Sequence, residues 1–299
     1  MRIFVTGATG WIGSAVVEDL LGRGHVPLCL VRSEDKAAAL RDKGAEAVVG
    51  TLAETGVLRR ATERSDGVIH LAFGADLSNI AALAEEDRQA IETMGAVLAG
   101  SDRPFIGTGG LGLLPEGGVF TEAMAPGPIN PAFPRASEQT IAALAGTGLN
   151  ATWVRNPRSV HGVGETHGFI PALARIAREK GVSAYIGEGQ NLWPAVHRSD
   201  AARVYTLAVE AGGRGGPFHA VAEEGIPFRA IAETMAAQLG LAARALSVEE
   251  AKAHFGPTAM FVGGNGPASS ARTRACLGWE PRGPGLIADI GQPAYYAGL

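Results

Sequence analysis

The chain begins with the stretch Met1-Arg2-Ile3-Phe4-Val5-Thr6-Gly7-Ala8-Thr9-Gly10-Trp11-Ile12-Gly13. A short apolar run, Ile3–Val5, breaks into glycines at positions 7, 10 and 13, and an apolar, helix-compatible stretch, Ile12–Leu21, follows. Strand, glycine-rich turn and helix in this order are the context in which such glycines bind a nucleotide. The first segment therefore predicts a nucleotide-binding turn.

Each glycine of this turn has a separate expected role. Gly7 lets the chain turn sharply, Gly10 lets the backbone approach a pyrophosphate, and Gly13 lets the helix pack on its strand. The helix N-terminus then offers unpaired N–H groups and the positive end of its dipole to the phosphates. A dinucleotide is the ligand that fits this arrangement.

Strand and helix signals alternate through the first half of the chain. The expected strands are Arg2–Thr6, Val26–Val31, Ala47–Val49, Gly67–Ala72, Pro104–Gly107 and Ala151–Arg155. The expected helices are Ile12–Leu21, Lys36–Lys43, Ala53–Thr62, Ile80–Ala99 and Arg135–Ala145. This alternation predicts an α/β fold, a Rossmann-type doubly wound parallel sheet with ligands beyond the carboxyl ends of its strands.

The alternation of strand and helix signals ends at about residue 160, where a glycine-containing loop precedes an expected helix, Ile170–Glu179. A helix (Asp200–Glu210) and a strand (Pro217–Val221) are expected to return to the sheet, and two more helices follow, Pro227–Leu239 and Val248–His254. We therefore predict a nucleotide-binding domain of residues 1–160 plus about 195–225. Residues of about 161–194 and 226–299 are expected to form a small, discontinuous C-terminal substrate lobe.

Composition narrows the classes of partner. The 299 residues are 46% hydrophobic, enough for a large core, and the net charge of −4 with scattered basic residues argues against a nucleic-acid partner. Cys29 and Cys276 have no metal or redox spacing, which is typical of reduced cysteines in the cytoplasm. Neither a signal-peptide pattern nor an apolar run of about 18 residues is present, so no membrane partner is expected. The fold class alone favours a homodimer.

Three segments carry a resemblance: Thr6-Gly7-Ala8-Thr9-Gly10-Trp11-Ile12-Gly13, His70-Leu71-Ala72 and Arg155-Asn156-Pro157-Arg158-Ser159-Val160-His161-Gly162. Together they resemble the extended short-chain dehydrogenase/reductases, the NAD(P)-dependent epimerase/dehydratase family. The segment 193–202 is similar to a later strand-to-helix landmark of that family. The resemblance implies that pyrophosphate and ribose are bound by Gly7, Thr9, Gly10, Trp11, Ile12 and Gly13.

The same resemblance implies three further groups of cofactor contacts. Leu71, Ala72 and Phe73 should line the ribose, Leu52 should lie against the adenine, and Pro157 and Val160 should lie near the nicotinamide.

The sequence differs from the family pattern at the family's pair of catalytic residues. The family uses a Tyr proton donor and a Lys four residues later, at the start of the helix after the fifth strand. Here that segment reads Asn-Pro-Ala-Phe-Pro-Arg-Ala-Ser-Glu-Gln, residues 130–139, and has neither residue. The first Tyr of the chain is Tyr185, and no Lys lies between Lys43 and Lys180. The chain therefore resembles an atypical branch of the family.

Three other residues are candidates for the chemistry. Thr108 ends the fifth expected strand, where catalytic hydroxyls lie in this fold, and His161 has a side chain whose ordinary pKa, near 6.5, suits proton donation. Arg135 is the nearest replacement for the missing Lys and can hold a ribose or an acidic substrate. A structural role stays open for each of them. No metal site is expected, because no third ligand accompanies His161 and His167.

The end of the second expected strand indicates which dinucleotide is bound. Arg32 and Ser33 stand where a carboxylate would bind the 2′-hydroxyl of NAD. An arginine at this position suits the 2′-phosphate of NADP instead. We therefore expect NADP(H) to be preferred over NAD(H).

The function that follows is an NADP(H)-dependent oxidoreductase that reduces a carbonyl or imine of a small organic substrate, with a non-standard proton donor. Thr108, His161 or a water that they hold would supply the proton. Two alternatives stay open: a non-catalytic NADP(H)-binding sensor or regulatory protein, and an epimerase or dehydratase of the sugar-nucleotide type.

Overall fold

The structure is a computed structural model that describes residues 1–74, 79–112, 117–131 and 133–299. Its main sheet has the strand order β10-β6-β5-β4-β1-β2-β3, and every neighbouring pair is parallel. The strands of this sheet are β1 (Arg2–Thr6), β2 (Val26–Val31), β3 (Glu46–Val49), β4 (Gly67–His70), β5 (Phe105–Gly110), β6 (Ala151–Asn156) and β10 (Phe218–His219). The predicted Rossmann-type α/β fold is confirmed, and the strand order reverses between β4 and β1, where such folds bind their ligands.

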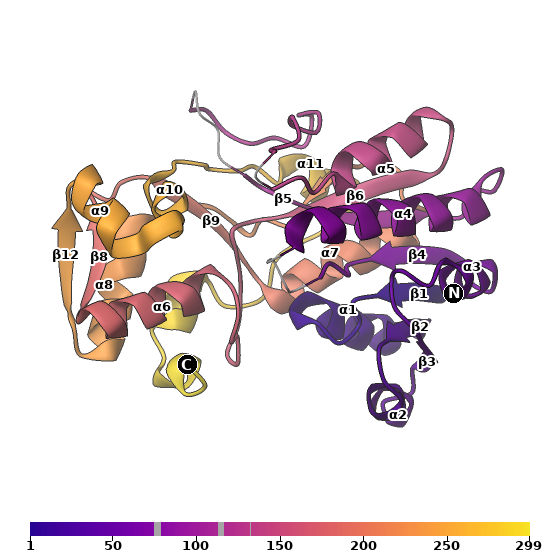
Figure 1. The fold of residues 1–299 in the computed structure, drawn as a ribbon, viewed down its shortest axis with the longest axis horizontal. Coiled ribbons are helices and arrows are strands. Elements are labelled where there is room, and N and C mark those ends of the chain that lie inside the picture. Colours follow the sequence, from indigo (N-terminus) through magenta and orange to yellow (C-terminus); the bar gives the residue numbers. More distant parts are fainter. Residues whose placement is uncertain (75–78, 113–116, 132) are drawn as a thin grey trace.

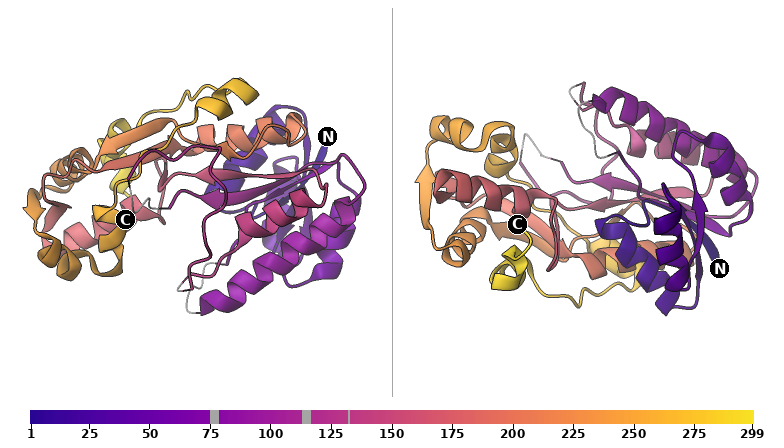
Figure 2. Two further views of the ribbon diagram at one scale, coloured as in Figure 1. Left: turned by 90° about the horizontal axis from the view of Figure 1, so that it is seen from above. Right: turned by 60° about the horizontal axis from the view of Figure 1, so that its bottom comes forward.

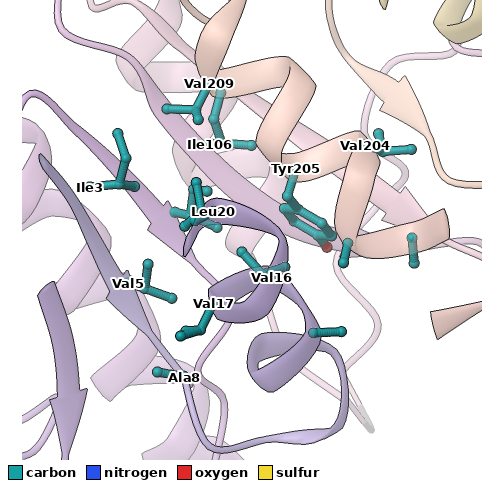
Figure 3. Close-up of a cluster of buried hydrophobic side chains, with 14 of the residues drawn as sticks. Ile3, Val5, Ala8, Val16, Val17, Leu20, Ile106, Val204, Tyr205 and Val209 are labelled. Atoms are coloured by element: carbon teal, nitrogen blue, oxygen red, sulfur yellow. The ribbon is translucent and has the colours of Figure 1, made fainter. Parts of the chain in front are cut away.

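Helices cover both faces of this sheet (Figure 1). On one face α1 (Trp11–Gly22) packs against α7 (Arg198–Glu210), and α2 (Glu34–Asp42) joins the same core. On the other face lie α3 (Thr55–Glu63), α4 (Ile80–Leu98) and α5 (Ser137–Gly146). Figure 3 shows the first core, where side chains of β1, α1 and α7 meet and the ring of Tyr205 lies among them.

Most of the remaining elements lie at the other end of the molecule, whereas α11 (Ala271–Leu277) lies beside the main sheet (Figures 1 and 2). A small sheet has the order β11-β9-β7, and a parallel pair joins β12 to β8. The strands are β7 (Ser159–His161), β8 (Val182–Ile186), β9 (Leu192–His197), β11 (Glu223–Pro227) and β12 (Ala242–Leu246). The helices are α6 (Phe169–Lys180), α8 (Phe228–Leu239), α9 (Val248–Phe255), α10 (Ala259–Gly263), α11 (Ala271–Leu277) and α12 (Leu286–Ile290), with 3-10 turns η2 (Gly256–Thr258) and η3 (Pro293–Tyr296).

Several predicted boundaries shift for a physical reason. The strand expected to reach Ala72 ends at His70. The Leu71 N–H still donates to the Thr6 carbonyl (3.3 Å) as well as to the Thr6 hydroxyl (3.2 Å), but the Ala72 N–H donates to that hydroxyl (3.2 Å) and not to the backbone of β1. The strand expected to end at Gly107 continues to Gly110, where it still pairs with β6.

The division into a nucleotide-binding domain and a lobe stays a prediction, which we propose with one change. Trp279, expected in the lobe, is fully buried in the core of α1 and α7, and its indole N–H donates to the Asp200 carbonyl (3.1 Å). The Asp200 carboxylate accepts from the backbone of Arg282 and Gly283. Residues 271–283 therefore pack with the large sheet.

Candidate functional site

The glycine-rich turn between β1 and α1 has no room for side chains at two of its glycines. Gly7 has a φ of +71°, and a Cβ on it would lie 2.7 Å from the Ala72 nitrogen. A Cβ on Gly13 would lie 2.0 Å from the Gly7 carbonyl oxygen. Gly10 precedes α1 and offers no side-chain cap, so the first-turn N–H groups of the helix face outward unpaired by a capping side chain. This is the geometry of an anion-binding turn.

An open pocket of about 320 Å³ lies against this turn, lined by Thr9, Gly10, Trp11, Ser14, Thr166 and His167. Trp11 joins the turn to β7 of the small sheet, because its indole N–H donates to the Val160 carbonyl (2.6 Å). The Arg198 guanidinium lies 4.2 Å from the centre of the Trp11 ring. Ile12, the next residue of α1, is half-buried against the core of the first face.

The end of β2 lies beside the turn, since β1 and β2 are parallel neighbours. Arg32 is exposed, and no hydrogen bond or ion pair engages its side chain within the described ranges. Ser33 stands at the N-cap of α2 without a side-chain cap bond. Both side chains are therefore free to contact a phosphate. Leu52 is half-buried after β3 and packs on the core of the second face.

A chain of buried hydrogen bonds runs beneath the carboxyl ends of β1 and β4. The Thr6 hydroxyl accepts from two backbone N–H groups, so its own hydrogen points to Nδ1 of His70 (2.7 Å). The hydrogen of His70 is thereby placed on Nε2, which donates to Asp87 (3.0 Å). Asp87 also accepts from the Ser137 hydroxyl (2.5 Å), and Ser137 accepts from Nε of Arg135 (2.8 Å).

Asp87 is the charge that anchors this chain. Burial raises the pKa of Asp87, but the hydrogen bond from His70, the charge of Arg135 and the hydrogen bond from Ser137 together lower it by more, and the net shift is downward. The carboxylate therefore stays ionised and holds the Arg135 cation in place through Ser137.

Arg135, Thr108 and Phe73 come together at the carboxyl ends of β4 and β5. Nη2 of Arg135 donates to the Thr108 carbonyl (3.4 Å), and its guanidinium lies 4.2 Å from the centre of the Phe73 ring. The Thr108 hydroxyl donates to the His70 carbonyl (2.7 Å) and accepts from the Tyr205 hydroxyl (3.2 Å). The structure thus brings two of the three predicted catalytic residues into one half-buried site.

His161 lies in a different cluster. Its ring is fully buried, its Nδ1 bonds to the Asp289 carboxylate (2.7 Å), and its Nε2 is buried without a hydrogen-bond partner among the described residues. His197 stacks edge-on against it, with ring centres 5.7 Å apart. No contact joins His161 to Thr108 within the described part of the chain, and its ring is closed to a substrate in this structure.

Sequence reasoning missed the residues that support the site. Asp87 lies on the buried stripe of α4 between Ala84 and Ile91, where its neighbours are apolar. A single Asp on such a stripe is a detectable signal, since buried carboxylates need partners. Tyr205 gave no comparable signal, because aromatic residues on a buried helix face are ordinary core residues.

Glu165 gives a prediction that is independent of any ligand. Burial raises its pKa to about 8 from an ordinary 4.5, opposed by a hydrogen bond from Tyr295 and assisted by the Asp289 charge. A carboxyl whose pKa is raised in the folded protein contributes stability that is complete below pH 4.5 and is lost as the pH rises through about 8. Glu165→Gln should remove this loss of stability, because glutamine does not titrate. Each unit of pKa shift corresponds to about 1.4 kcal/mol of unfolding free energy.

The measurement is thermal unfolding of both proteins at pH 5 and pH 8. We expect Glu165→Gln to lose less stability than the wild type over this interval, and the exposed Glu224→Gln to behave as wild type. Parallel curves for Glu165→Gln and wild type would show that Glu165 does not titrate in this range.

Within the ranges given above, no group of three or more His, Cys, Asp and Glu side chains is placed to hold a metal ion. Over the same residues, none of the helices has both the length and the apolar character needed to cross a membrane.

A parallel sheet with this strand order and a tight glycine turn at its switch point defines a Rossmann-type nucleotide-binding protein. The model of the NAD dependent epimerase/dehydratase family matches residues 3–221. The chain belongs to this family.

Relatives of known sequence and structure are similar over most of the chain. "Uncharacterized protein C2A9.02" of Schizosaccharomyces pombe is 43% identical over 296 residues, 99% of this chain and 100% of that protein. A Stigmatella aurantiaca protein, "4-hydroxy-2-methyl-3-oxo-4-farnesyl-3,4-dihydroquinoline-1-oxide ketoreductase", is 28% identical over 223 residues, 71% of this chain and 65% of that one. DesIV, a dTDP-glucose 4,6-dehydratase of Streptomyces venezuelae solved with NAD and TYD, has a TM-score of 0.75 at 19% identity, with 99% and 97% of the chains covered.

Proposed function

We propose that the chain is an NADP(H)-dependent oxidoreductase that reduces a carbonyl or imine of a small organic substrate. The observation that carries the proposal is the placement of Arg135 against Thr108 at the strand ends next to the glycine turn, where it is held by the Asp87 chain. A cation and a hydroxyl on a fixed support suit the stabilisation of an oxygen that gains negative charge. The ketoreductase among the relatives supports this class of reaction.

The residues present fit a dinucleotide. The turn of Gly7, Gly10 and Gly13 and the α1 N-terminus would hold the pyrophosphate, with Thr9, Trp11 and Ile12 beside it. Leu71, Ala72 and Phe73 would line the ribose, and the buried Pro157 and half-buried Val160 would lie near the nicotinamide. When bound, NADPH supplies the hydride, and the rest of the site positions the acceptor.

The Thr108 hydroxyl is oriented by a chain of buried hydrogen bonds. Nδ2 of Asn156 donates to the Tyr205 hydroxyl (2.7 Å), which donates to the Thr108 hydroxyl. Rotation of the Thr108 hydroxyl from the His70 carbonyl toward the substrate leaves both of these bonds in place. The electron pair of a reduced C=O bond would move to oxygen, which would take a proton from Thr108 or from a water that Thr108 holds, and solvent water would return that proton to the donor. The burial of His161 favours Thr108 over His161 in this role.

Cofactor preference gives a direct test of the Arg32 assignment. Arg32→Ala should weaken NADPH binding about 10-fold to 100-fold, because a charge-assisted contact to the 2′-phosphate is worth about 1.5–3 kcal/mol. NADH binding should change little. Fluorescence titration of both cofactors measures the two affinities. Equal losses for NADPH and NADH would remove Arg32 from the 2′-phosphate site.

A second candidate function is binding without turnover, as in a redox sensor. The missing Tyr and Lys favour it, since the chain has no Tyr before Tyr185. Oxidation of NADPH, followed by absorbance with a panel of aldehydes, ketones and imines, separates the two candidates. Turnover supports the reductase, whereas tight NADPH binding with no turnover across the panel supports the sensor.

A further inference from the structure

Arg158, in the turn between β6 and β7, is a buried cation without a counter-ion. Its side chain is 7% exposed, and its Nη2 donates to the Leu192 carbonyl (3.0 Å). Nε and Nη1 are buried and have no hydrogen-bond partner among the residues that the structure describes. Within the same residues, none of the ion pairs includes Arg158, although Arg155 nearby is paired with Glu138.

An unpaired buried charge of this kind is costly. Removing a charged group from water without a partner destabilises a protein by several kcal/mol. Burial lowers the pKa of Arg158 only to about 10, so the guanidinium keeps its charge at neutral pH. The Trp193 ring, 4.5 Å from the guanidinium carbon, offsets part of the cost through a cation–π contact of about 2 kcal/mol. The remaining donors still lack an acceptor.

The backbone segments that surround the Arg158 guanidinium are held together by a second set of contacts. A Cβ on Gly266 would lie 3.1 Å from Nη2, so the chain passes directly against the guanidinium. The Gly266 N–H donates to the same Leu192 carbonyl (3.1 Å), and the Leu192 N–H donates to the Asn265 side chain (2.7 Å). The cation is therefore held by β9 and the segment 264–266 and does not reach solvent as a flexible surface arginine would.

Its position relates Arg158 to the proposed reaction. Arg158 follows Asn156, the last residue of β6, which pairs with Gly110 at the carboxyl edge of the main sheet. The intervening Pro157 is a proposed nicotinamide neighbour. The backbone of Arg158 thus stands within two residues of the sheet edge at which the substrate would react, and its side chain lies against β9.

We propose that Arg158 binds an oxyanion, a carboxylate or a phosphate ester, of the substrate, so that the reductase acts on a small acidic carbonyl or imine compound. The substrate class rests on the proposed function, whereas the anion site itself does not. A planar guanidinium with unused N–H donors in a desolvated setting is a suitable partner for either oxyanion.

The test uses the full chain and measures thermal unfolding with succinate or inorganic phosphate, against sodium chloride at equal ionic strength. Succinate, phosphate or both should raise the unfolding temperature of the wild type in a saturable manner. Arg158→Met should be at least as stable as the wild type without anion, because an unpaired buried charge is removed, and should show none of the anion-specific rise. Arg158→Lys should bind the same anion at least 10-fold more weakly, since an ammonium group lacks the paired N–H donors of a planar guanidinium.

Arg274 provides a matched control, because its guanidinium lies 5.2 Å from the Trp279 ring but its donors are bonded to Ser270 and the Ala222 carbonyl. Arg274→Met should lower stability and keep the anion response. No saturable response in wild type, or an equal response in Arg158→Met, would overturn the site. A response to succinate but not phosphate assigns a carboxylate, and the reverse assigns a phosphate ester.

Failure of the proposed function is separately visible. If the wild type binds the anion through Arg158 but does not bind NADPH in the fluorescence titration, the anion site is supported and the proposed reductase function is wrong. If NADPH is bound and oxidised but no anion response is seen, the reductase stands and Arg158 has no ligand role.

Discussion

Gly13→Ala is expected to reduce NADPH affinity by roughly 100-fold or more and to destabilise the protein by about 3 kcal/mol. The new Cβ would lie 2.0 Å from the Gly7 carbonyl oxygen, a backbone atom that cannot rotate away. Either α1 must move away from β1 or the turn must open, and both changes misplace the N–H groups proposed to hold the pyrophosphate. Chemical denaturation and NADPH fluorescence titration measure the two effects.

Gly22 provides the matched control on the same helix. A Cβ on Gly22 has no heavy atom within 4 Å, and the residue lies in the last turn of α1. Gly22→Ala should therefore stabilise the protein by about 0.5–1 kcal/mol and leave NADPH affinity unchanged. If Gly13→Ala kept the wild-type affinity for NADPH, the glycine turn would not be the pyrophosphate site.

The first turn and the main sheet were predictable because their signals are local. The bounds of β1 and β2 match the expected strands, since an apolar run between turn residues specifies a buried parallel strand without reference to distant residues. The glycine spacing then fixes which end of the sheet binds a ligand. The strands β7, β8, β11 and β12 were not predicted, and β9 was indicated only by the resemblance of segment 193–202, because these strands pair only within the smaller sheets.

The residues that support the candidate site were less predictable, because the contacts between them are not local in sequence. Thr108 could be selected from its place near the end of an expected strand and Arg135 from its place before a helix, but the chain Thr6–His70–Asp87–Ser137 joins residues far apart in sequence. Its existence depends on how α4 and α5 pack on the sheet. His161 illustrates the opposite case: its residue type suggested proton donation, while its burial against Asp289 depends on α12, more than a hundred residues later.

Thr108→Val is expected to lower kcat by roughly 100-fold to 10,000-fold, the range for losing a positioned proton donor. Valine keeps the shape but removes the hydroxyl that accepts from Tyr205 and donates to the His70 carbonyl. The Tyr205 hydroxyl then loses its acceptor in the core, which should cost about 1–3 kcal/mol of stability. Steady-state NADPH oxidation and chemical denaturation measure the two effects, with KM changing little.

Thr108→Ser separates the chemical role from the structural one, because it restores the hydroxyl but not the methyl group. Activity should return to within about 10-fold of wild type if the hydroxyl supplies the proton or holds the water that does. The exposed Thr147→Val also loses a hydroxyl, one bonded only to the Leu144 carbonyl, and should keep full activity. If Thr108→Val kept the wild-type kcat, the proton would come from a group independent of Thr108, and Arg135 alone would remain to stabilise the developing charge.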